Sequence, residues 1–452
     1  MRTDTTRLQA SPGRVVRARR TRRTGLVAAA GVLTTALSLT ALAAPAALAE
    51  PGAPPPTGAA QGTSPTGPDL RVEPGDEGPQ RWAPPLAGTS TGVAITEGTA
   101  RLSTTRDGTE TGPAALRGAE RQGLLDLGSH QFATPVNRID APVVGDVPPG
   151  SRVAVDVRGQ DADGEWSEWI PAEPGAPAVL PEPTRTVAVR LAMLAPTGSA
   201  GPVVRSLEVL ADEVATGPRT IAPRASYRVF ATREGLVGGV TANGHRITPD
   251  DQFAALPSRR ALSPNGRGDY SVRVCTEAGR CATVPIWDVG PWNTTDDYWN
   301  PPAERQSWKD LPQGRPQAQA AYENKHNGGR DGFGRQVKNP AGIDLADGTF
   351  HGLGLTSNAF VTVDYLWTAR SAPLGRAATA GAGPVVERAS PDTAAADGGV
   401  VGDGAQVEVH CQVGGSPVTG SQGTSNLWLR TRPDRYVPAA WIQGAPPVPP
   451  CT

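Results

Sequence analysis

A single aspartate in the middle of the chain stands in surroundings that suit proton transfer. Asp288 follows the apolar run "TVPIW" and precedes a Gly290-Pro291 turn, with Trp287 and Trp292 close by in sequence. Apolar surroundings disfavour the ionised form of a carboxyl group and raise its pKa, which suits a general acid. Cleavage of a glycosidic bond needs such an acid to protonate the leaving oxygen. The alternative is structural, with the Asp288 side chain accepting hydrogen bonds from backbone N–H groups of the turn.

The four cysteines lie in the second half of the chain, and their spacing predicts two disulfides. Cys275 and Cys281 flank a short turn and would face each other across a hairpin, whereas Cys411 and Cys451 bracket the end of the chain. Zinc is the alternative, but neither pair has the CxxC spacing typical of zinc ligands. No Ser-His-Asp, Cys-His, nucleotide-loop or HExxH pattern occurs. We expect no metal and no cofactor.

The elements that must position Asp288 follow one another in a distinctive order. Between residues 225 and 367 the chain reads "GGVTANGHRI", "FAALPS", "YSVRVCTEAGRCATVPIWDVGPWN", "GIDLADGTF" and "AFVTVDYLW". This order resembles the rare lipoprotein A-like family, which shows a T-A-x-G loop, an A-A…L-P turn, two paired strands, a D-x-G-P motif and an I-D-L strand end. Expansins share this fold. The resemblance covers about 140 of the 452 residues and implies a six-stranded double-psi β-barrel that works on cell-wall glycan.

The resemblance makes Asp288 the candidate catalytic residue, because one carboxyl group can serve as acid and then as base in lytic transglycosylases. Catalytic members usually carry Glu where this chain has His245, and His where it has Leu256, so two of three expected polar groups are absent. His245 either donates a hydrogen bond to sugar or is an exposed turn residue. Asp344 either belongs to the barrel framework or contacts the ligand. The candidate ligand-binding residues are Thr241, Asn243, His245, Trp287, Trp292, Trp299 and Asp344.

A long segment separates the D-x-G-P motif from the I-D-L motif. Residues 294–341 are much longer than the family's usual connector and contain five aromatic residues, Trp299 among them. An insertion of this size beside a candidate site is more often functional than neutral. We interpret it as a groove wall or lid whose aromatic rings stack on sugars. The alternative is a self-packed excursion with its own small aromatic core.

The N-terminus has the pattern of an export signal. Six arginines between residues 14 and 23 precede an apolar run over 25–48, and the run ends in the small-x-small motif Ala47–Ala49. This predicts a signal peptide over 1–49 that is removed. A permanent membrane anchor is the alternative, because the run is long enough to span a bilayer. The Pro-rich residues 50–80 favour cleavage and predict a disordered linker.

The charge of the chain excludes nucleic acid as a partner. Removal of residues 1–49 takes eight arginines and one aspartate from a chain of formal net charge −1, which leaves −8. An acidic chain has no electrostatic footprint for nucleic acid, and bulk anionic wall polymer would repel it. Affinity for peptidoglycan or another wall polysaccharide must then come from local sites. We expect a secreted or wall-associated monomer without stable membrane association after cleavage.

Residues 81–212 predict a β-sandwich accessory domain. Valines and leucines alternate with other residues in "SRVAVDVRGQ", "TVAVRLAML" and "VVRSLEVLA", as in half-buried strands. "DGEWSEWIP" resembles a turn and strand of accessory domains in secreted bacterial hydrolases. Trp166 and Trp169 would point to opposite faces of a strand, so that one lies in the core and the other is exposed. An exposed Trp could stack on a sugar; the alternative is that it packs on its own sandwich.

The C-terminal part is expected to hold a linker and a small domain. Residues 368–402 are rich in Ala, Gly and Pro and predict a second linker. "CQVGG", "VTGSQGTSNLWLR" and "YVPAAWI", within residues 403–452, resemble the bacterial SH3-like modules of actinobacterial secreted wall enzymes. A barrel of this size has a thin core, so the Cys411–Cys451 staple is expected. The complete prediction is an all-β chain of sandwich, double-psi barrel with a long insertion, and SH3-like barrel, joined by flexible linkers.

Three classes of function fit this reading. The first is a lytic transglycosylase-like enzyme that uses Asp288, the second a non-catalytic, expansin-like wall-binding protein, and the third a protein-binding barrel of the inhibitor type. An open groove in which Asp288 lies beside a second carboxylate or a histidine favours catalysis. A groove lined only by aromatic residues favours binding.

Overall fold

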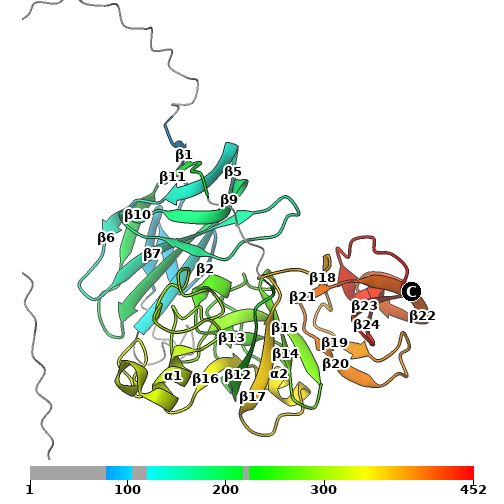
Figure 1. The fold of residues 1–452 in the computed structure, drawn as a ribbon. Helices are drawn as coiled ribbons and strands as arrows, with labels where there is room; N and C mark the ends of the chain where they lie inside the picture. Colours follow the sequence, from blue (N-terminus) through cyan, green and yellow to red (C-terminus); the bar gives the residue numbers. More distant parts are fainter. Residues whose placement is uncertain (1–77, 104–119, 217–222) are drawn as a thin grey trace, which may run out of the picture. The chain divides into compact units, whose positions relative to one another are not determined.

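The computed structural model describes residues 78–103, 120–216 and 223–452 (Figure 1). The signal peptide predicted over 1–49 and most of the linker predicted over 50–80 lie outside these residues. The described part consists mainly of β-strands, so the all-β prediction is confirmed. Within it, no helix is both long enough and apolar enough to cross a bilayer.

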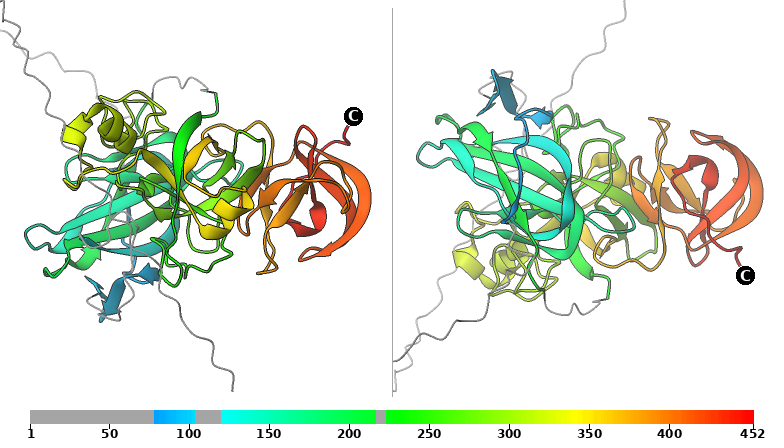
Figure 2. Two further views of the ribbon diagram at one scale, coloured as in Figure 1. Left: turned by 90° about the horizontal axis from the view of Figure 1, so that it is seen from below. Right: turned by 90° about the horizontal axis from the view of Figure 1, so that it is seen from above.

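Residues 80–103 and 120–212 form two antiparallel sheets that share one core (Figure 2). The first sheet has the order β1 (Gln80–Trp82), β11 (Val209–Asp212), β5 (Glu120–Asp140), β9 (Ala178–Pro196), β7 (Arg152–Gln160) and β8 (Ile170–Ala172), with β2 (Thr89–Thr91) paired to β5. The second has the order β3 (Val93–Thr96), β4 (Thr99–Leu102), β10 (Val203–Leu207) and β6 (Val143–Asp146). Alternating apolar residues such as Val155, Val157 and Leu191 fill the space between the sheets. This is the predicted sandwich.

The polar face of the first sheet is also buried. Asp156 and Arg158 on β7 and Arg190 on β9 are each no more than 5% exposed. Arg190 pairs with Asp156 at 2.9 Å and donates hydrogen bonds to the backbone carbonyls of Arg259 at 2.6 Å and Leu262 at 3.3 Å. A period-two pattern does not distinguish a polar face in water from one that is covered. Here the face packs against the segment around η2 (Arg259–Ala261).

Six strands close into a barrel between residues 226 and 365 (Figure 1). They are β12 (Ser226–Arg233), β13 (Ala254–Leu256), β14 (Ser271–Cys275), β15 (Cys281–Val289), β16 (Ala341–Leu345) and β17 (Ala359–Tyr365). Their order β13-β16-β12-β17-β14-β15 is closed by the pairing of β15 with β13. The β12–β16 and β13–β15 pairs are parallel and the other four are antiparallel. Fully buried side chains such as Val229, Val272 and Ile343 fill the interior, so the closed six-stranded barrel is confirmed.

The long insertion between β15 and β16 buries some of its large side chains, whereas Tyr322 is exposed. It contains α1 (Gln317–Asn324) and the short turn η3 (His326–Gly329), and α2 (Asp347–Gly352) follows β16. Tyr298 is fully buried and donates a hydrogen bond to the carbonyl of Gly342 at 2.9 Å. Arg305 is also fully buried and pairs with Asp296. Burial raises the pKa of Asp296 to about 6, although Arg305 opposes the shift. Tyr298 and Trp299 therefore pack into the core of the barrel, rather than into a separate aromatic core of the insertion.

The expected linker over 368–402 is wrong, because three strands lie within it. They are β18 (Leu374–Ala377), β19 (Val385–Arg388) and β20 (Asp397–Val401). β20 runs parallel to β15 of the barrel, with Gly399 opposite Cys281. Ala377, Val385 and Val401 are buried in the C-terminal core. Short strands built from Gly, Ala and Arg show no clear alternation, so composition alone suggested a linker.

The last module therefore begins near residue 374 rather than at 403. Its other elements are β21 (Gln406–Glu408), β22 (Cys411–Gly420), β23 (Gly423–Arg432), β24 (Arg435–Pro438), η4 (Ala439–Trp441) and β25 (Ile442–Gln443). The order β20-β19-β24-β23-β22 continues the barrel sheet, and β21-β18-β25 form a separate sheet. Figure 2 shows these strands, orange to red, curving around one another.

Both predicted disulfides are confirmed. Cys275 and Cys281 are paired across the β14–β15 hairpin, and Cys411 is joined to Cys451. No cysteine is left free in the part of the chain that the structure describes.

Candidate functional site

Three neighbouring strands bring two aspartates together at one end of the barrel. Asp288 lies on β15 and Asp344 on β16, and the strand pairing places each of them opposite Ala255 of β13. Side chains of residues paired across neighbouring strands lie close together, and the small Ala255 side chain leaves room for two carboxyl groups. We call Asp288 and Asp344 the acidic pair.

The Asp288 carboxyl group accepts hydrogen bonds from backbone amides and does not face solvent. Its Oδ1 accepts a hydrogen bond from the amide of Ala242 at 2.8 Å and another from the amide of Val289 at 2.8 Å. Asp288 is 0% exposed. The side chain therefore fixes the loop over 241–245 against the end of β15. Asp288 thus holds backbone amides, as in the structural alternative, but those of Ala242 and Val289 rather than of the Gly290-Pro291 turn.

Asp344 is the second member of the acidic pair. It is 9% exposed, and its Oδ1 accepts a hydrogen bond from the Thr232 hydroxyl. Burial raises the pKa of Asp344 to about 7, the negative charge of Asp288 adds to the rise, and the Thr232 hydrogen bond opposes it. Asp344 therefore gains and loses a proton near neutral pH.

The loop over 241–245 uses most of its polar groups internally. The Thr241 hydroxyl donates to Asn243 Oδ1 at 2.7 Å, and Asn243 Nδ2 donates to the carbonyl of Ser263 at 3.0 Å. The backbone amide of Asn243 also bonds the carbonyl of Trp287. Thr241 and Asn243 are both buried. The structure thus brings Thr241, Asn243 and Trp287 together, but as a packed loop.

His245 offers the most accessible side chain of this group. Its side chain is 23% exposed, and Nε2 lies 2.7 Å from Asp251 Oδ2. Its ring centroid lies 4.7 Å from that of Trp287. Trp287 is 7% exposed and donates its indole N–H to the carbonyl of Arg267. His245 is therefore a partly exposed residue held by a carboxylate and an aromatic ring.

The two remaining tryptophans donate their indole hydrogen bonds to residues outside the acidic pair. The Trp292 indole donates to Asn339 Oδ1 at 2.9 Å, and its half-buried ring packs against Val337 and two alanines of α1. Trp299 is 1% exposed and donates to Glu168 Oε1 at 2.6 Å. The expectation that Trp299 stacks on sugar is therefore wrong, because its ring belongs to the barrel core.

Glu168 is an anchoring residue that sequence reasoning missed. Besides Trp299, it accepts hydrogen bonds from Asn300 Nδ2 at 2.8 Å and the Trp367 indole at 2.7 Å, and it pairs with Arg260 at 3.0 Å. It thus ties the strand-connecting turn after β7 to the barrel. No local sequence pattern indicates this role of Glu168, because all of these partners lie more than 90 residues away in sequence.

The two tryptophans of "DGEWSEWIP" do not point to opposite faces as expected, because the Arg158 guanidinium lies over both rings, 4.4 Å from the centre of Trp166 and 4.2 Å from that of Trp169. Trp169 is 1% exposed and donates its indole N–H to the carbonyl of Leu262 at 3.1 Å, whereas Trp166 is partly exposed. Within the described ranges, no group of three or more His, Cys, Asp or Glu side chains could hold a metal ion.

Comparison with known proteins supports the barrel as a unit. The model of a family described as a domain of unknown function (DUF8814) matches residues 225–364. These limits nearly coincide with the barrel from β12 to β17. No curated protein matches the chain significantly. The family match covers about a third of the chain, and its description assigns no activity.

Proposed function

We propose that this is an exported cell-wall protein that binds peptidoglycan or another wall polysaccharide without cleaving it. As part of this proposal, residues 225–367 form a double-psi barrel of the rare lipoprotein A-like kind. The last module is a bacterial SH3-like domain. The observation that carries the proposal is the state of Asp288. Its carboxyl group has no exposed surface and accepts hydrogen bonds from two backbone amides.

A general acid must come within hydrogen-bond reach of the glycosidic oxygen. The Asp288 carboxyl group is buried and already accepts hydrogen bonds from two backbone amides, so it does not present a proton to an incoming sugar. The other two catalytic positions of the resembling family do not replace it. Leu256 is buried in the core, and the His245 ring pairs with Asp251. These features favour binding over cleavage.

Export is supported by the N-terminal pattern and by the disulfides. Two disulfides are typical of a chain that folds in an oxidising compartment. With the signal peptide removed, the chain would be acidic, so its attraction to an anionic wall would be local rather than a bulk charge effect.

Co-sedimentation with purified sacculi tests this proposal. We expect the protein to sediment with sacculi and to remain bound at high salt, because local contacts are screened less than bulk charge. An unrelated acidic protein of similar size and charge is the control for non-specific trapping of protein in the pelleted sacculi. A protein that stays in the supernatant at low and high salt would refute the proposal.

A second candidate function is catalysis with Asp344, rather than Asp288, as the acid. One observation favours it: Asp344 has a pKa raised to about 7 and lies beside a second carboxyl group. A carboxyl group with such a pKa is protonated in part at neutral pH, which a general acid requires. This alternative predicts soluble cleavage products that depend on Asp344.

A further inference from the structure

A cavity of about 360 Å³ lies where the sandwich, the barrel and the C-terminal module meet. Ligand sites in proteins have volumes of about 300–1,000 Å³, so this cavity is large enough for one small ring and too small for a chain. It is separate from the acidic pair. Its polar and aromatic lining consists of Glu165 and Trp166 from the turn after β7, Arg267 and Asp269 before β14, Arg376 of β18, Gln406 of β21, and Gln443 of β25.

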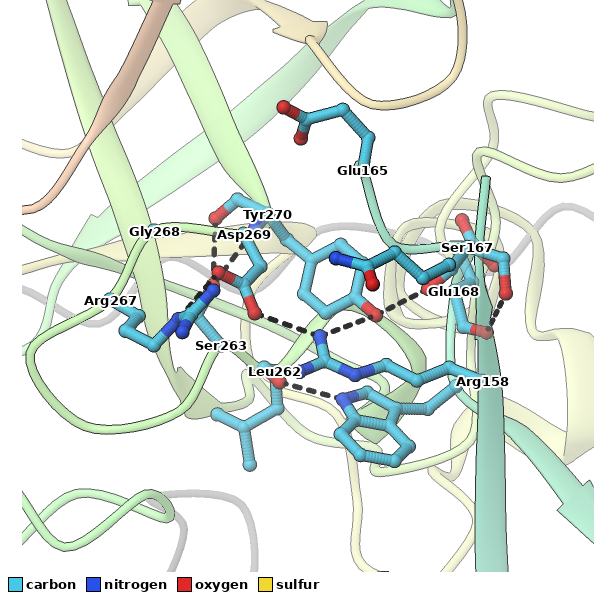
Figure 3. A network of polar contacts seen from close by, with 12 residues as sticks. Arg158, Glu165, Ser167, Glu168, Leu262, Ser263, Arg267, Gly268, Asp269 and Tyr270 are labelled. Carbon is cyan, nitrogen blue, oxygen red and sulfur yellow. Dashed lines mark hydrogen bonds and ion pairs between the residues drawn. The ribbon is translucent and has the colours of Figure 1, made fainter. Parts of the chain in front are cut away.

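The inner wall of the cavity is fixed by a buried polar network. Arg158 donates from Nη1 to Asp269 Oδ2 at 2.9 Å and to the Tyr270 hydroxyl at 3.3 Å (Figure 3). Tyr270 in turn donates its hydroxyl proton to the carbonyl of Ser167 at 2.5 Å. Burial raises the pKa of Tyr270 to about 12, so this hydroxyl stays protonated. The network holds the turn of the sandwich against the barrel before any ligand arrives.

The C-terminal side of the cavity is also held in place. The Gln406 amide donates to Glu165 Oε2 at 2.8 Å, and its backbone N–H donates to the Ser271 hydroxyl at 2.9 Å. These two bonds join β21 to the sandwich turn and to the start of β14. The cavity is therefore preformed on three sides, which lowers the entropic cost of binding.

Trp166 supplies the apolar surface of the cavity. The guanidinium group of Arg158 lies 4.4 Å from the centre of the Trp166 ring and covers one of its faces. Trp166 is partly exposed and lines the cavity, so its uncovered surface is available to a ligand. The C–H face of a pyranose ring packs on such an aromatic surface, while its hydroxyl groups remain free to bond polar neighbours.

The lining of the cavity carries charged groups of both signs. Asp269 is shared by two arginines, Arg158 and Arg267, the second donating from Nε at 2.9 Å. The Arg267 side chain is 54% exposed. Arg376 bonds Gln443 and, among the described residues, forms no ion pair. Two arginines and two acids, Glu165 and Asp269, thus line the cavity. The buried Arg158 lies behind this lining and shares the charge of Asp269 with Arg267, which leaves Arg376 to attract an anion.

We propose that this cavity binds a single carboxylated pyranose, a hexuronate unit. The sugar ring packs on Trp166, the carboxylate lies between Arg267 and Arg376, and the hydroxyls bond Glu165 and Gln443. A carboxylate and a guanidinium group form charge-assisted hydrogen bonds, which select the acid over the neutral sugar. The inference rests on the proposed function in one respect, since it names the class of wall saccharide that the protein recognises.

Isothermal titration calorimetry of the full chain with D-glucuronate tests the inference, with D-glucose and acetate as comparison ligands. We expect glucuronate to bind at least tenfold more tightly than either of them, because only glucuronate engages both Trp166 and the arginines. Equal affinity for glucose would overturn the role of the arginines. Equal affinity for acetate would show a simple anion site, and no glucuronate binding at millimolar concentrations would remove the site altogether.

Matched variants locate the binding. We expect Trp166→Ala and Arg267→Gln each to weaken glucuronate binding about tenfold or more. Arg267 is exposed, so its substitution leaves the fold intact even if Trp166→Ala disturbs it. Arg228→Gln is the control, because Arg228 is an arginine of the same barrel with a side-chain exposure of 57% and does not line the cavity. Unchanged affinity in Arg267→Gln, or an equal loss in Arg228→Gln, would contradict the proposal.

The sacculus assay separates failure of this inference from failure of the proposed function. Sedimentation with sacculi without glucuronate binding would leave the wall-binding function and remove the cavity. Glucuronate binding without sedimentation would leave the cavity and remove the wall-binding function.

Discussion

The Asp288 carboxyl group connects a loop to a strand through hydrogen bonds to Ala242 and Val289. Asparagine has nearly the same shape but no charge, so these bonds weaken in Asp288→Asn. We expect a loss of about 1–3 kcal/mol in the free energy of unfolding, measured by chemical denaturation. Asp250→Asn is the control, because Asp250 is exposed. An equal effect of the two substitutions would argue against the structural role of Asp288.

Asp344 makes the stability of the barrel depend on pH. Its folded-state pKa of about 7 lies above the unfolded value of about 3.9. The stabilisation is therefore complete below pH 4 and is lost as the pH rises through 7. Asp344→Asn removes this dependence, and Asn can still accept the Thr232 hydrogen bond. We expect the variant to gain stability relative to the wild type, by a few kcal/mol at most, between pH 4 and pH 8.

Melting temperatures of both proteins at several pH values measure this gain. Asp296, whose pKa is raised to about 6, titrates in an overlapping range. It is present in both proteins, so its contribution cancels in the difference. A difference in melting temperature that does not change with pH would contradict the assigned pKa of Asp344.

At the scale of residues, the order of the sequence motifs predicted some residues of the candidate site, but not how exposed their side chains are. The D-x-G-P and I-D-L motifs singled out Asp288 and Asp344, and the strand pairing does bring them together. Whether a side chain is buried depends on which distant segments of the chain pack over it, and a short sequence motif does not contain that information. Trp299 illustrates the point, because its indole bonds Glu168, which lies 131 residues earlier in the sequence.

Strand β20 lies in a segment whose composition resembles a linker, yet it pairs with β15. Gly399 has φ of +153°, and a Cβ atom placed on it would lie 2.2 Å from the carbonyl oxygen of Cys281. We expect Gly399→Ala to destabilise the fold by about 1–3 kcal/mol from backbone strain alone, with the clash adding to the loss. Gly414→Ala is the matched control, since nothing lies within 4 Å of a Cβ atom there.

Thermal unfolding of both variants measures the difference. Equal melting temperatures for Gly399→Ala and the wild type would mean that β20 does not pair with the barrel as described. The same pairing predicts that residues 374–401 resist limited proteolysis in the intact protein, because their strands are hydrogen-bonded and partly buried.

Elements with strong alternation were predictable, and weakly patterned ones were not. "SRVAVDVRGQ" predicted a strand and one core face correctly. It did not predict that Asp156 and Arg158, on the other face, would be buried against the barrel. "LGRA" and "DGGVV" carry too few large apolar residues to show a period, although they form β18 and β20.

At the scale of the molecule, the sandwich and the barrel are joined by apolar contacts, such as Leu194 with Leu262 and Val289 in one buried cluster, and by polar ones. Arg158 with Asp269, and Arg190 with the carbonyls near η2, connect the sandwich to the barrel. Buried ion pairs fix the geometry of the groups they join more than they add to the net free energy of folding. The order of the modules was readable from the sequence. Their contacts were not, because each joins residues separated by about 70 positions or more.

The most direct test of the account is mass spectrometry of the soluble material released when the purified protein is incubated with sacculi. We expect the wild type to sediment with the sacculi and to release no anhydro-muropeptides. Anhydro-muropeptides that appear with the wild type and vanish with Asp344→Asn would contradict it, and they would establish Asp344 as the acid of a lytic transglycosylase-like reaction.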